Sequence, residues 1–250
     1  MAAYLKFGLS KLKPSFIEVV MPRGRPHGGN SHQDRIDDLF GNELVCDPLF
    51  FEVRARASGF TCIAGLDEAG RGPLAGPVVA AAVVLPVGLL IPGLKDSKQV
   101  PEQDRERLFD KIREQATCYS IGIVDERTID DVNILRATII AMERALETLA
   151  LRPDYLLIDA LILPRVPLPQ KPLIKGDCRS HSIAAASILA KVTRDRLMLE
   201  LHEKFPQYNF QKNKGYGTRE HMELLRRHGP CDAHRKSFNP VAQMLRGEAR

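Results

Sequence analysis

Four short segments of the chain carry hydrophobic residues in patterns typical of β-strands. Residues 61–66, 78–85 and 155–159 are apolar runs of strand length, and residues 117–124 alternate between apolar and polar positions. The run at 155–159 is typical of a buried strand and ends in a carboxylate, Asp159. We therefore expect four strands in this part of the chain.

Longer segments between and after these strands carry the signals of helices. Pro101 opens one of them with acidic residues in its first turn, Asn133 is placed to cap another, and Gly59 ends a third. The predicted helices span residues 44–58, 101–116, 133–151, 180–205 and 218–228. Strands come first and helices alternate with them afterwards, so the order predicts an α/β fold with a mixed sheet.

The first 45 residues differ from the rest. Residues 22–31 are rich in Pro, Gly and Arg and have no apolar periodicity, which is typical of a flexible segment. We expect a flexible N-terminal extension over residues 1–45 and one folded domain over residues 46–250.

Composition excludes several classes of protein. The five cysteines are odd in number, widely scattered and without a CxxC pair, which argues against a disulfide scaffold and favours a reducing compartment. Prolines interrupt the longest uncharged run, residues 73–94, so it does not resemble a membrane span. No secretory signal is visible in the first residues, where lysines recur. We expect a soluble cytoplasmic protein without a membrane partner.

Charge is distributed unevenly along the chain. The formal net charge is +5, but residues 171–250 hold 16 basic and 8 acidic residues, against 20 and 23 in the first 170. A basic C-terminal third fits a polyanionic partner such as nucleic acid, and a solvated basic face explains it equally well.

The most informative local feature is the pair Asp67 and Glu68, which directly follows an apolar strand and precedes the glycine-rich sequence 70–76. Adjacent carboxylates at a strand end repel each other unless a cation lies between them, and Mg²⁺ prefers oxygen ligands. The alternative is an acidic turn that caps a helix. A dinucleotide fingerprint is excluded, because a predicted strand rather than a helix follows the glycines.

Further candidates lie on other elements. Asp159 would converge on Asp67 if their strands are neighbours, although an Asp that merely starts a turn is common. Ser187, Lys191 and Asp195 fall within an arc of about 80° on an otherwise apolar helix. This polar seam predicts contact with a metal and a phosphate, or else an internal ion pair between Lys191 and Asp195.

Two features near the C-terminus complete the set. Tyr216 lies between two glycines in a basic loop, where it can stack on a base or a sugar, or simply pack the loop onto the core. His228, Cys231 and His234 have an HxxCxxH spacing that matches no reliable zinc pattern, so we do not expect zinc there.

Taken together, these segments closely resemble ribonuclease HII, the bacterial type 2 ribonuclease H. The resemblance covers roughly residues 45–240. Its pieces occur in the family's order: residues 67–77, 96–98, 159, 175–177, 182–196, 215–218 and 234–238.

The resemblance implies a ribonuclease H-like fold, with a central mixed sheet flanked by helices and a helical C-terminal segment. It implies four acidic metal ligands, which match Asp67, Glu68, Asp159 and Asp195, and two Mg²⁺ or Mn²⁺ ions. One ion would activate a water and the other would stabilise the leaving 3′ oxygen, giving 3′-hydroxyl and 5′-phosphate ends.

The resemblance also implies the substrate. The family hydrolyses the RNA strand of RNA–DNA hybrids and nicks 5′ of single ribonucleotides embedded in duplex DNA. The loop of Gly70, Arg71 and Gly72 would contact the ribose 2′-hydroxyl, and Tyr216 would check the sugar across the cut. The remaining implied phosphate contacts are Ser97, Lys98, Ser187 and Lys191.

The related ribonuclease HIII resembles this family but has Thr in place of the loop arginine, so Arg71 favours HII. The sequence departs from many family members at Ala160-Leu161 and at His181, neither of which is an expected metal ligand. Leu39 and Phe40 resemble a sliding-clamp-binding peptide, although so short a match arises easily by chance. We expect a monomer.

Two other classes of function compete with the nuclease. A nucleic-acid-binding module without chemistry has no need for four carboxylates, which would repel phosphate. A metal-dependent enzyme for a small phosphorylated substrate explains the acids but not the basic C-terminal third or the loop of Tyr216.

Overall fold

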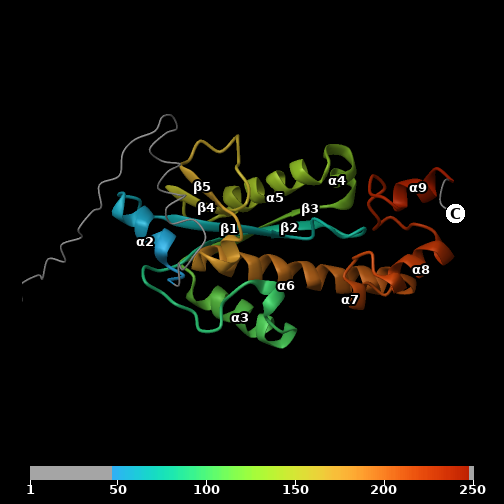
Figure 1. The fold of residues 1–250 in the computed structure, drawn as a ribbon, viewed down its shortest axis with the longest axis horizontal. Helices are drawn as coiled ribbons and strands as arrows, with labels where there is room; N and C mark the ends of the chain where they lie inside the picture. The colour runs from blue at the N-terminus through green and yellow to red at the C-terminus, as the bar shows by residue number, and fades with distance from the viewer. Residues whose placement is uncertain (1–46, 248–250) are drawn as a thin grey trace, which may run out of the picture. The chain divides into compact units, whose positions relative to one another are not determined.

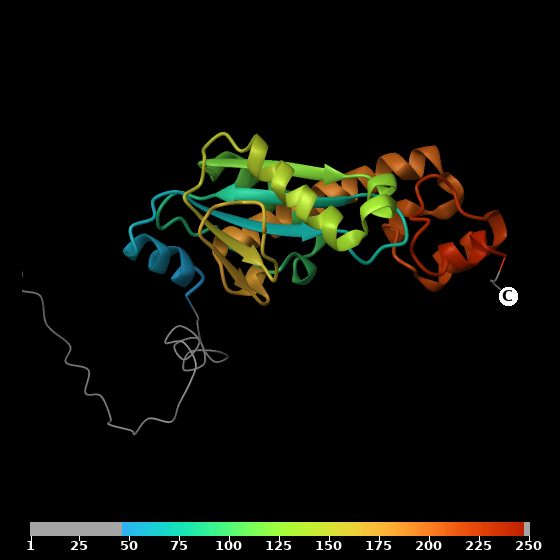
Figure 2. The same ribbon diagram turned by 90° about the horizontal axis from the view of Figure 1, so that it is seen from above.

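The computed structural model describes residues 47–247, in which a mixed sheet of five strands lies between two layers of helices (Figures 1 and 2). The strands are β1 (Ile63–Ala69), β2 (Val78–Val84), β3 (Cys118–Val124), β4 (Tyr155–Asp159) and β5 (Gln170–Leu173). Their order in the sheet is β3-β2-β1-β4-β5. β1 pairs antiparallel with β2 and parallel with β4, so the predicted mixed sheet is confirmed.

Helices cover both faces of the sheet. The helices before the C-terminal segment are α2 (Phe50–Ala57), α3 (Glu102–Gln115), α4 (Glu126–Val132), α5 (Ile134–Thr148) and α6 (His181–Lys204). Figure 1 shows α4 and α5 on one side of the sheet and α3 and α6 on the other. Because both faces of β2 are covered, all seven of its residues are buried.

The C-terminal segment packs as a group of short helices around its own apolar cluster. They are α7 (Phe210–Asn213), α8 (Arg219–His228) and α9 (Val241–Leu245), and they lie together at one end of the sheet (Figures 1 and 2). Met198 of α6 belongs to the same cluster as Phe210 and Leu225, so the long helix connects the sheet to this segment.

Local sequence signals account for where the helices begin. Asn133 accepts a hydrogen bond from the amide of Arg136, as the predicted cap requires, and Ser180 accepts one from Ile183 at the start of α6. Pro101 immediately precedes α3. Four elements were not predicted from the sequence, α4, β5, α7 and α9, because they are short or polar.

Glycines in the sheet allow the helices to approach closely. A Cβ atom at Gly65 of β1 would lie 2.2 Å from the carbonyl carbon of Ser182 at the start of α6. A Cβ atom at Gly122 of β3 would lie 1.9 Å from the carbonyl oxygen of Ala141 in α5. The first contact places the N-terminal half of α6 directly against β1, where the predicted site residues lie.

Two sequence predictions are limited by the extent of the structure. The N-terminal extension, with Leu39 and Phe40, lies outside the described residues. Within residues 47–247, no helix is both long enough and apolar enough to cross a bilayer.

Candidate active site

The C-terminal end of β1 holds Asp67 and Glu68. Ala64 and Leu66 face the α5 side of the sheet, so by alternation Asp67 faces α6. Asp67 is 5% exposed. One of its carboxylate oxygens accepts a hydrogen bond from the amide of Glu68 at 2.7 Å, and Ser187 of α6 donates to the same carboxylate. Strand and helix therefore both orient this side chain.

Asp159 lies beside Asp67 because β4 runs parallel to β1. Leu66 pairs with Ile158, so the next residue of each strand is an aspartate. The Oδ1 atom of Asp159 accepts a hydrogen bond from the amide of Gly176 at 2.7 Å. The predicted convergence of two strand-ending carboxylates on one sheet edge is what the structure shows.

Crowding of carboxylates makes this edge electrostatically strained. Burial raises the pKa of Asp67 well above its usual range, and Glu68 and Asp159 raise it further. Burial also raises the pKa of Glu68, with Arg71 opposing the shift and Asp159 adding to it. Among the described residues, no donor reaches the buried Oε2 atom of Glu68. The cluster thus holds more negative charge and more free oxygen atoms than its protein neighbours satisfy.

Asp177 joins this cluster, which the sequence analysis did not predict. It lies in the short turn Gly176–Cys178, next to the amide that binds Asp159. Burial raises the pKa of Asp177, and Asp96 and Asp159 raise it further. Asp96, Asp177 and Cys178 each offer one atom that could bind a metal ion, and these three atoms all lie within 4.8 Å of one another. The only sequence signal for Asp177 was its place in the Lys-Gly-Asp motif.

Lys98 is the cation that faces these acids. Burial alone would lower the pKa of its ammonium group, but Asp96, Asp177, Asp67 and Asp159 together raise it. Arg71 provides a second positive charge, with its Nη1 atom 3.1 Å from Oε1 of Glu68. Two of the predicted substrate-contacting residues therefore neutralise part of the carboxylate cluster.

The structure does not bring Asp195 to the other three predicted acids. Asp195 follows Ser187, the residue of α6 that contacts Asp67, by eight residues, which is about 12 Å along a helix. Lys191 donates to Asp195 at 2.7 Å, and Arg105 of α3 lies 3.7 Å from it. The structure thus shows the internal ion pair between Lys191 and Asp195 that the sequence analysis gave as the alternative. Ser187 and Asp195 share one face of the helix, but the rise along its axis keeps Asp195 away from the carboxylates that Ser187 reaches.

The other predicted phosphate contacts lie on two elements. The hydroxyl groups of Ser187 and Ser97 are hydrogen-bonded to each other at 2.9 Å, and both side chains are buried. Ser97 begins the short turn that carries Lys98. Lys191 is held by Asp195, and burial lowers the pKa of its ammonium group. Ser97, Lys98 and Ser187 therefore adjoin the carboxylates, whereas Lys191 pairs away from them.

The two predicted sugar-contacting elements lie next to each other. Arg71 and Gly72 are exposed, and Tyr216 is 44% exposed. A Cβ atom at Gly72 would lie 4.0 Å from Cε1 of Tyr216. An exposed aromatic ring thus borders an exposed loop that leads directly from Glu68.

His234 and Cys231, from the HxxCxxH sequence, take part in a buried hydrogen-bond chain. The Nδ1 atom of His234 lies 3.1 Å from the amide nitrogen and 3.2 Å from the sulfur of Cys231. Its Nε2 atom lies 3.1 Å from Nε2 of His221, whose Nδ1 donates to the carbonyl of Tyr216 at 2.8 Å. These side chains support the loop of Tyr216 from within.

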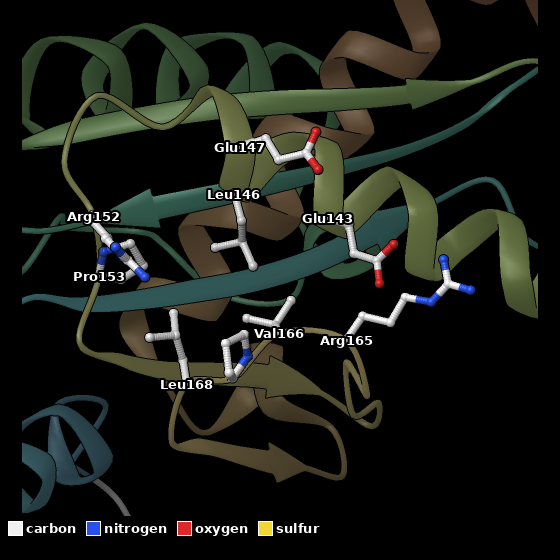
Figure 3. Close-up of a pocket in the computed structure, with 9 residues that line it drawn as sticks. Glu143, Leu146, Glu147, Arg152, Pro153, Arg165, Val166 and Leu168 are labelled. Carbon is white, nitrogen blue, oxygen red and sulfur yellow. The ribbon is translucent and has the colours of Figure 1, made fainter.

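A surface cavity of about 380 Å³ lies elsewhere, between α5 and the segment that joins β4 to β5 (Figure 3). Leu146, Val166 and Leu168 form its apolar part, and Glu143 and Arg165 lie on opposite walls. None of the predicted site residues lines it, and α5 covers the face of the sheet opposite Asp67. The candidate site is therefore the cluster of carboxylates at the C-terminal ends of β1 and β4, and not this cavity.

This chain resembles proteins of one family in both sequence and fold. The sequence model of ribonuclease HII matches residues 64–241. Ribonuclease HII of Caldanaerobacter subterraneus subsp. tengcongensis is 54% identical over 198 residues, which are 79% of this chain and 81% of that protein. Ribonuclease HII of Desulfitobacterium hafniense is 59% identical over 188 residues, 75% of this chain and 72% of the relative. Ribonuclease H2 from Pyrococcus horikoshii OT3 superposes with a TM-score of 0.64 at 27% identity, covering 75% of this chain and 99% of that one.

Proposed function

Because this chain belongs to the ribonuclease HII family, and so is an endoribonuclease acting on RNA–DNA hybrids, we propose that it also nicks duplex DNA 5′ of a single embedded ribonucleotide. Its fold is the ribonuclease H-like fold that the sequence predicted. The observation that supports the proposal is that the exposed residues Arg71 and Gly72 lie next to the exposed ring of Tyr216, beside the carboxylates. Two adjacent elements can read the sugars on both sides of one cut.

The carboxylate cluster fits the divalent metal that this family needs. The buried and unpartnered Oε2 of Glu68, together with the raised pKa of Asp67, indicates a site that is incomplete without a cation. Its donor atoms are oxygens, which suit Mg²⁺ or Mn²⁺. When bound, a pair of such ions would supply an activated water and would stabilise the leaving 3′ oxygen, which would yield 3′-hydroxyl and 5′-phosphate ends.

We propose Asp67, Glu68, Asp159 and Asp177 as the four acidic ligands. The first three retain the sequence prediction. Asp177 takes the fourth place because Asp159 and Lys98 face it, whereas Asp195 is held by Lys191 and Arg105.

The protein's own groups orient these ligands and the substrate. Ser187 donates a hydrogen bond to Asp67, and the amide of Gly176 donates one to Asp159. These bonds fix carboxylate groups that would otherwise rotate. In this proposal the loop of Gly70, Arg71 and Gly72 would meet the 2′-hydroxyl, the group that separates RNA from DNA. Ser97 and Lys98 would contact the phosphate flanking the cut.

Away from the site, we propose that the excess of basic residues after position 170 holds the duplex through its phosphates. This weak, general attraction would add affinity without selecting a sequence. Binding of the duplex should therefore weaken as the salt concentration rises.

The test is cleavage of a DNA duplex that carries one ribonucleotide, with Mg²⁺, with Mn²⁺ and with EDTA. We expect a nick 5′ of the ribonucleotide that EDTA and Asp67→Asn both abolish, and none in the all-DNA duplex. Tight binding of the duplex without any nick would contradict the proposal and favour a binding module.

A matched pair of variants tests the fourth ligand. Asp177→Asn should lower kcat at least 100-fold, the scale at which single catalytic groups act. Asp195→Asn should lower kcat less, because it breaks an ion pair rather than a ligand. The opposite ranking would restore Asp195 to the metal site.

We propose residues 46–250 as the catalytic domain and residues 1–45 as an extension outside it. Contact of Leu39 and Phe40 with a sliding clamp, a monomeric state and a cytoplasmic location also remain predictions.

A further inference from the structure

Two arginines lie buried beneath the Gly70–Gly72 loop without a carboxylate partner. Arg194 is 1% exposed and Arg235 is 0% exposed. Within residues 47–247, neither guanidinium forms an ion pair within 4.0 Å of a carboxylate. Burial lowers the pKa of both, that of Arg235 to about 9 with the charge of Arg194 contributing. Arginine side chains remain protonated in proteins at neutral pH. Buried cations require hydrogen-bond acceptors, and here the backbone supplies them.

Of the described carbonyl oxygens that accept bonds from these arginines, all but one belong to a single stretch, residues 70–77. Arg235 donates to the carbonyls of Gly70, Arg71 and Gly76 at 2.6, 3.0 and 2.8 Å. Both guanidiniums reach the carbonyl of Pro77, and Arg194 also reaches that of Ala75 at 3.1 Å. The loop is therefore held with its carbonyl oxygens turned toward the protein interior.

Turning the carbonyls inward fixes where the amides point. In a trans peptide the N–H lies opposite the C=O, so inward carbonyls at Gly70 and Arg71 aim the amides of Arg71 and Gly72 outward. Both residues are exposed, and among the described residues neither amide has an acceptor. Two adjacent N–H donors are thus presented to whatever lies over the loop.

Arg194 also connects this loop to the loop of Tyr216. Its Nη1 atom donates to the carbonyl of Lys214 at 3.0 Å, and its guanidinium lies 5.8 Å from the ring centroid of Tyr216. The amide of Leu74 donates to the carbonyl of Gly215 at 2.8 Å. A Cβ atom at Gly70 would lie 2.2 Å from Nε of Arg194, so the arginine fills the space beneath that glycine.

We propose that Arg194 and Arg235 are positioning residues for substrate selection: they fix the outward amides of Arg71 and Gly72 and set their spacing from Tyr216. Neither arginine touches the substrate. The inference rests on the proposed function, in which these two loops read the sugars on either side of the cut. A rigid spacing between the loops then selects an RNA–DNA junction over a uniform hybrid strand.

The experiment compares two substrates for each variant: a DNA duplex with one ribonucleotide and a continuous RNA–DNA hybrid. The variants are Arg194→Lys, Tyr216→Ala and the double variant, assayed well below their thermal midpoints. Lysine keeps the charge but cannot bond three carbonyls in a planar fork. Arg144→Lys is the control for the chemical change alone, since the exposed Arg144 donates to the carbonyl of Ile123 on the α5 side at 2.6 Å, away from both loops.

We expect Arg194→Lys to lower the ratio of kcat/KM for the single ribonucleotide to that for the hybrid about tenfold. In the Tyr216→Ala background, the same substitution should lower the ratio no further. A further variant, Arg235→Lys, should raise KM for both substrates with little change in kcat, because Arg235 holds only the loop that would meet the 2′-hydroxyl in either substrate. Arg144→Lys should leave all of these values unchanged.

Two results would overturn this inference alone. The first is a wild-type ratio of kcat/KM values in Arg194→Lys together with an unchanged KM in Arg235→Lys. The second is full additivity of Arg194→Lys and Tyr216→Ala in the double variant. Either result would leave the proposed function intact. A wild-type enzyme that leaves the single-ribonucleotide duplex uncut but cleaves the hybrid would overturn the proposed function, and this inference with it.

Discussion

Replacing Gly65 with alanine tests how closely α6 must approach β1 for catalysis. The new Cβ atom would lie 2.2 Å from the carbonyl carbon of Ser182 and 2.5 Å from the amide nitrogen of Ile183. Favourable contacts between carbon atoms occur at about 3.5–4.0 Å, so strand and helix must separate by roughly 1 Å or more. Backbone atoms cannot rotate away as side chains do. The separation therefore reaches Ser187, which orients Asp67 from the same helix.

The magnitude follows from this displacement. Overpacking a core costs about 1–3 kcal/mol, and a domain of this size loses about 2–4 °C of thermal midpoint for each kcal/mol. Misplacing a catalytic group by about 1 Å costs about 100-fold in rate. We therefore expect Gly65→Ala to lower the midpoint by several degrees and kcat on an RNA–DNA hybrid by about two orders of magnitude.

The assay combines thermal unfolding with hybrid hydrolysis at a temperature where every variant is folded. Met142→Ala is the control, because Met142 is fully buried on the α5 side and its truncation costs about 2–5 kcal/mol without touching α6. That variant should lose stability and keep kcat. The reasoning is refuted if Gly65→Ala cleaves at the wild-type rate, or if Met142→Ala loses as much activity.

Three further outcomes are expected. Burial, together with the nearby His221, lowers the pKa of His234 from 6.5 to about 4. As the pH falls, the imidazole of His234 is therefore protonated in the unfolded chain before it is protonated in the folded protein. Urea unfolding should show about 3 kcal/mol of stability lost between pH 6.5 and 4 through this group, and less of that slope in His234→Gln. Asp67→Asn should raise the metal-free thermal midpoint, because it removes a buried like charge, and should remove the rise that Mg²⁺ produces in the wild type. Gly122→Ala, whose Cβ atom would meet the carbonyl oxygen of Ala141, should lower the midpoint with little loss of kcat when measured on folded protein.

The parts of the site that lie on strands could be predicted because a strand carries a simple pattern. An apolar run that ends in a carboxylate, as at Asp67 and Asp159, indicates both a strand and the chemistry at its end. One further assumption, that β1 and β4 are neighbours, brought the two acids together. The parallel register of the strands makes that assumption correct.

Asp195 and Asp177 mark where such reasoning ends. The helical pattern gives the direction of Asp195 around the axis, but contact with Asp67 also depends on height along it. Asp177 lies in a turn with no periodicity, and its position depends on the hydrogen bond between the Gly176 amide and Asp159. Neither the height of Asp195 relative to Asp67 nor the position of the turn that carries Asp177 can be read from local sequence.

The missed elements have a similar explanation. β5 has the sequence Gln-Lys-Pro-Leu, which is polar and contains a proline, and such a strand is tolerated because it lies at the edge of the sheet. α4 is a short helix that begins at the cap Asp125 and ends just before Asn133. Their conformations depend on neighbours that come from distant parts of the chain.

The parallel pairing of β1 with β4 also sets the order in which the carboxylate cluster can assemble during translation. Asp67 is synthesised early, whereas Asp159, Asp177 and the orienting Ser187 come much later. At about 5–20 residues per second, the ribosome needs several seconds to pass from the first acid to the last. A nascent chain released before Asp159 is synthesised has β1, β2 and β3 but cannot form the cluster. Chains that terminate before Asp159 should therefore have no nuclease activity at all rather than weak activity.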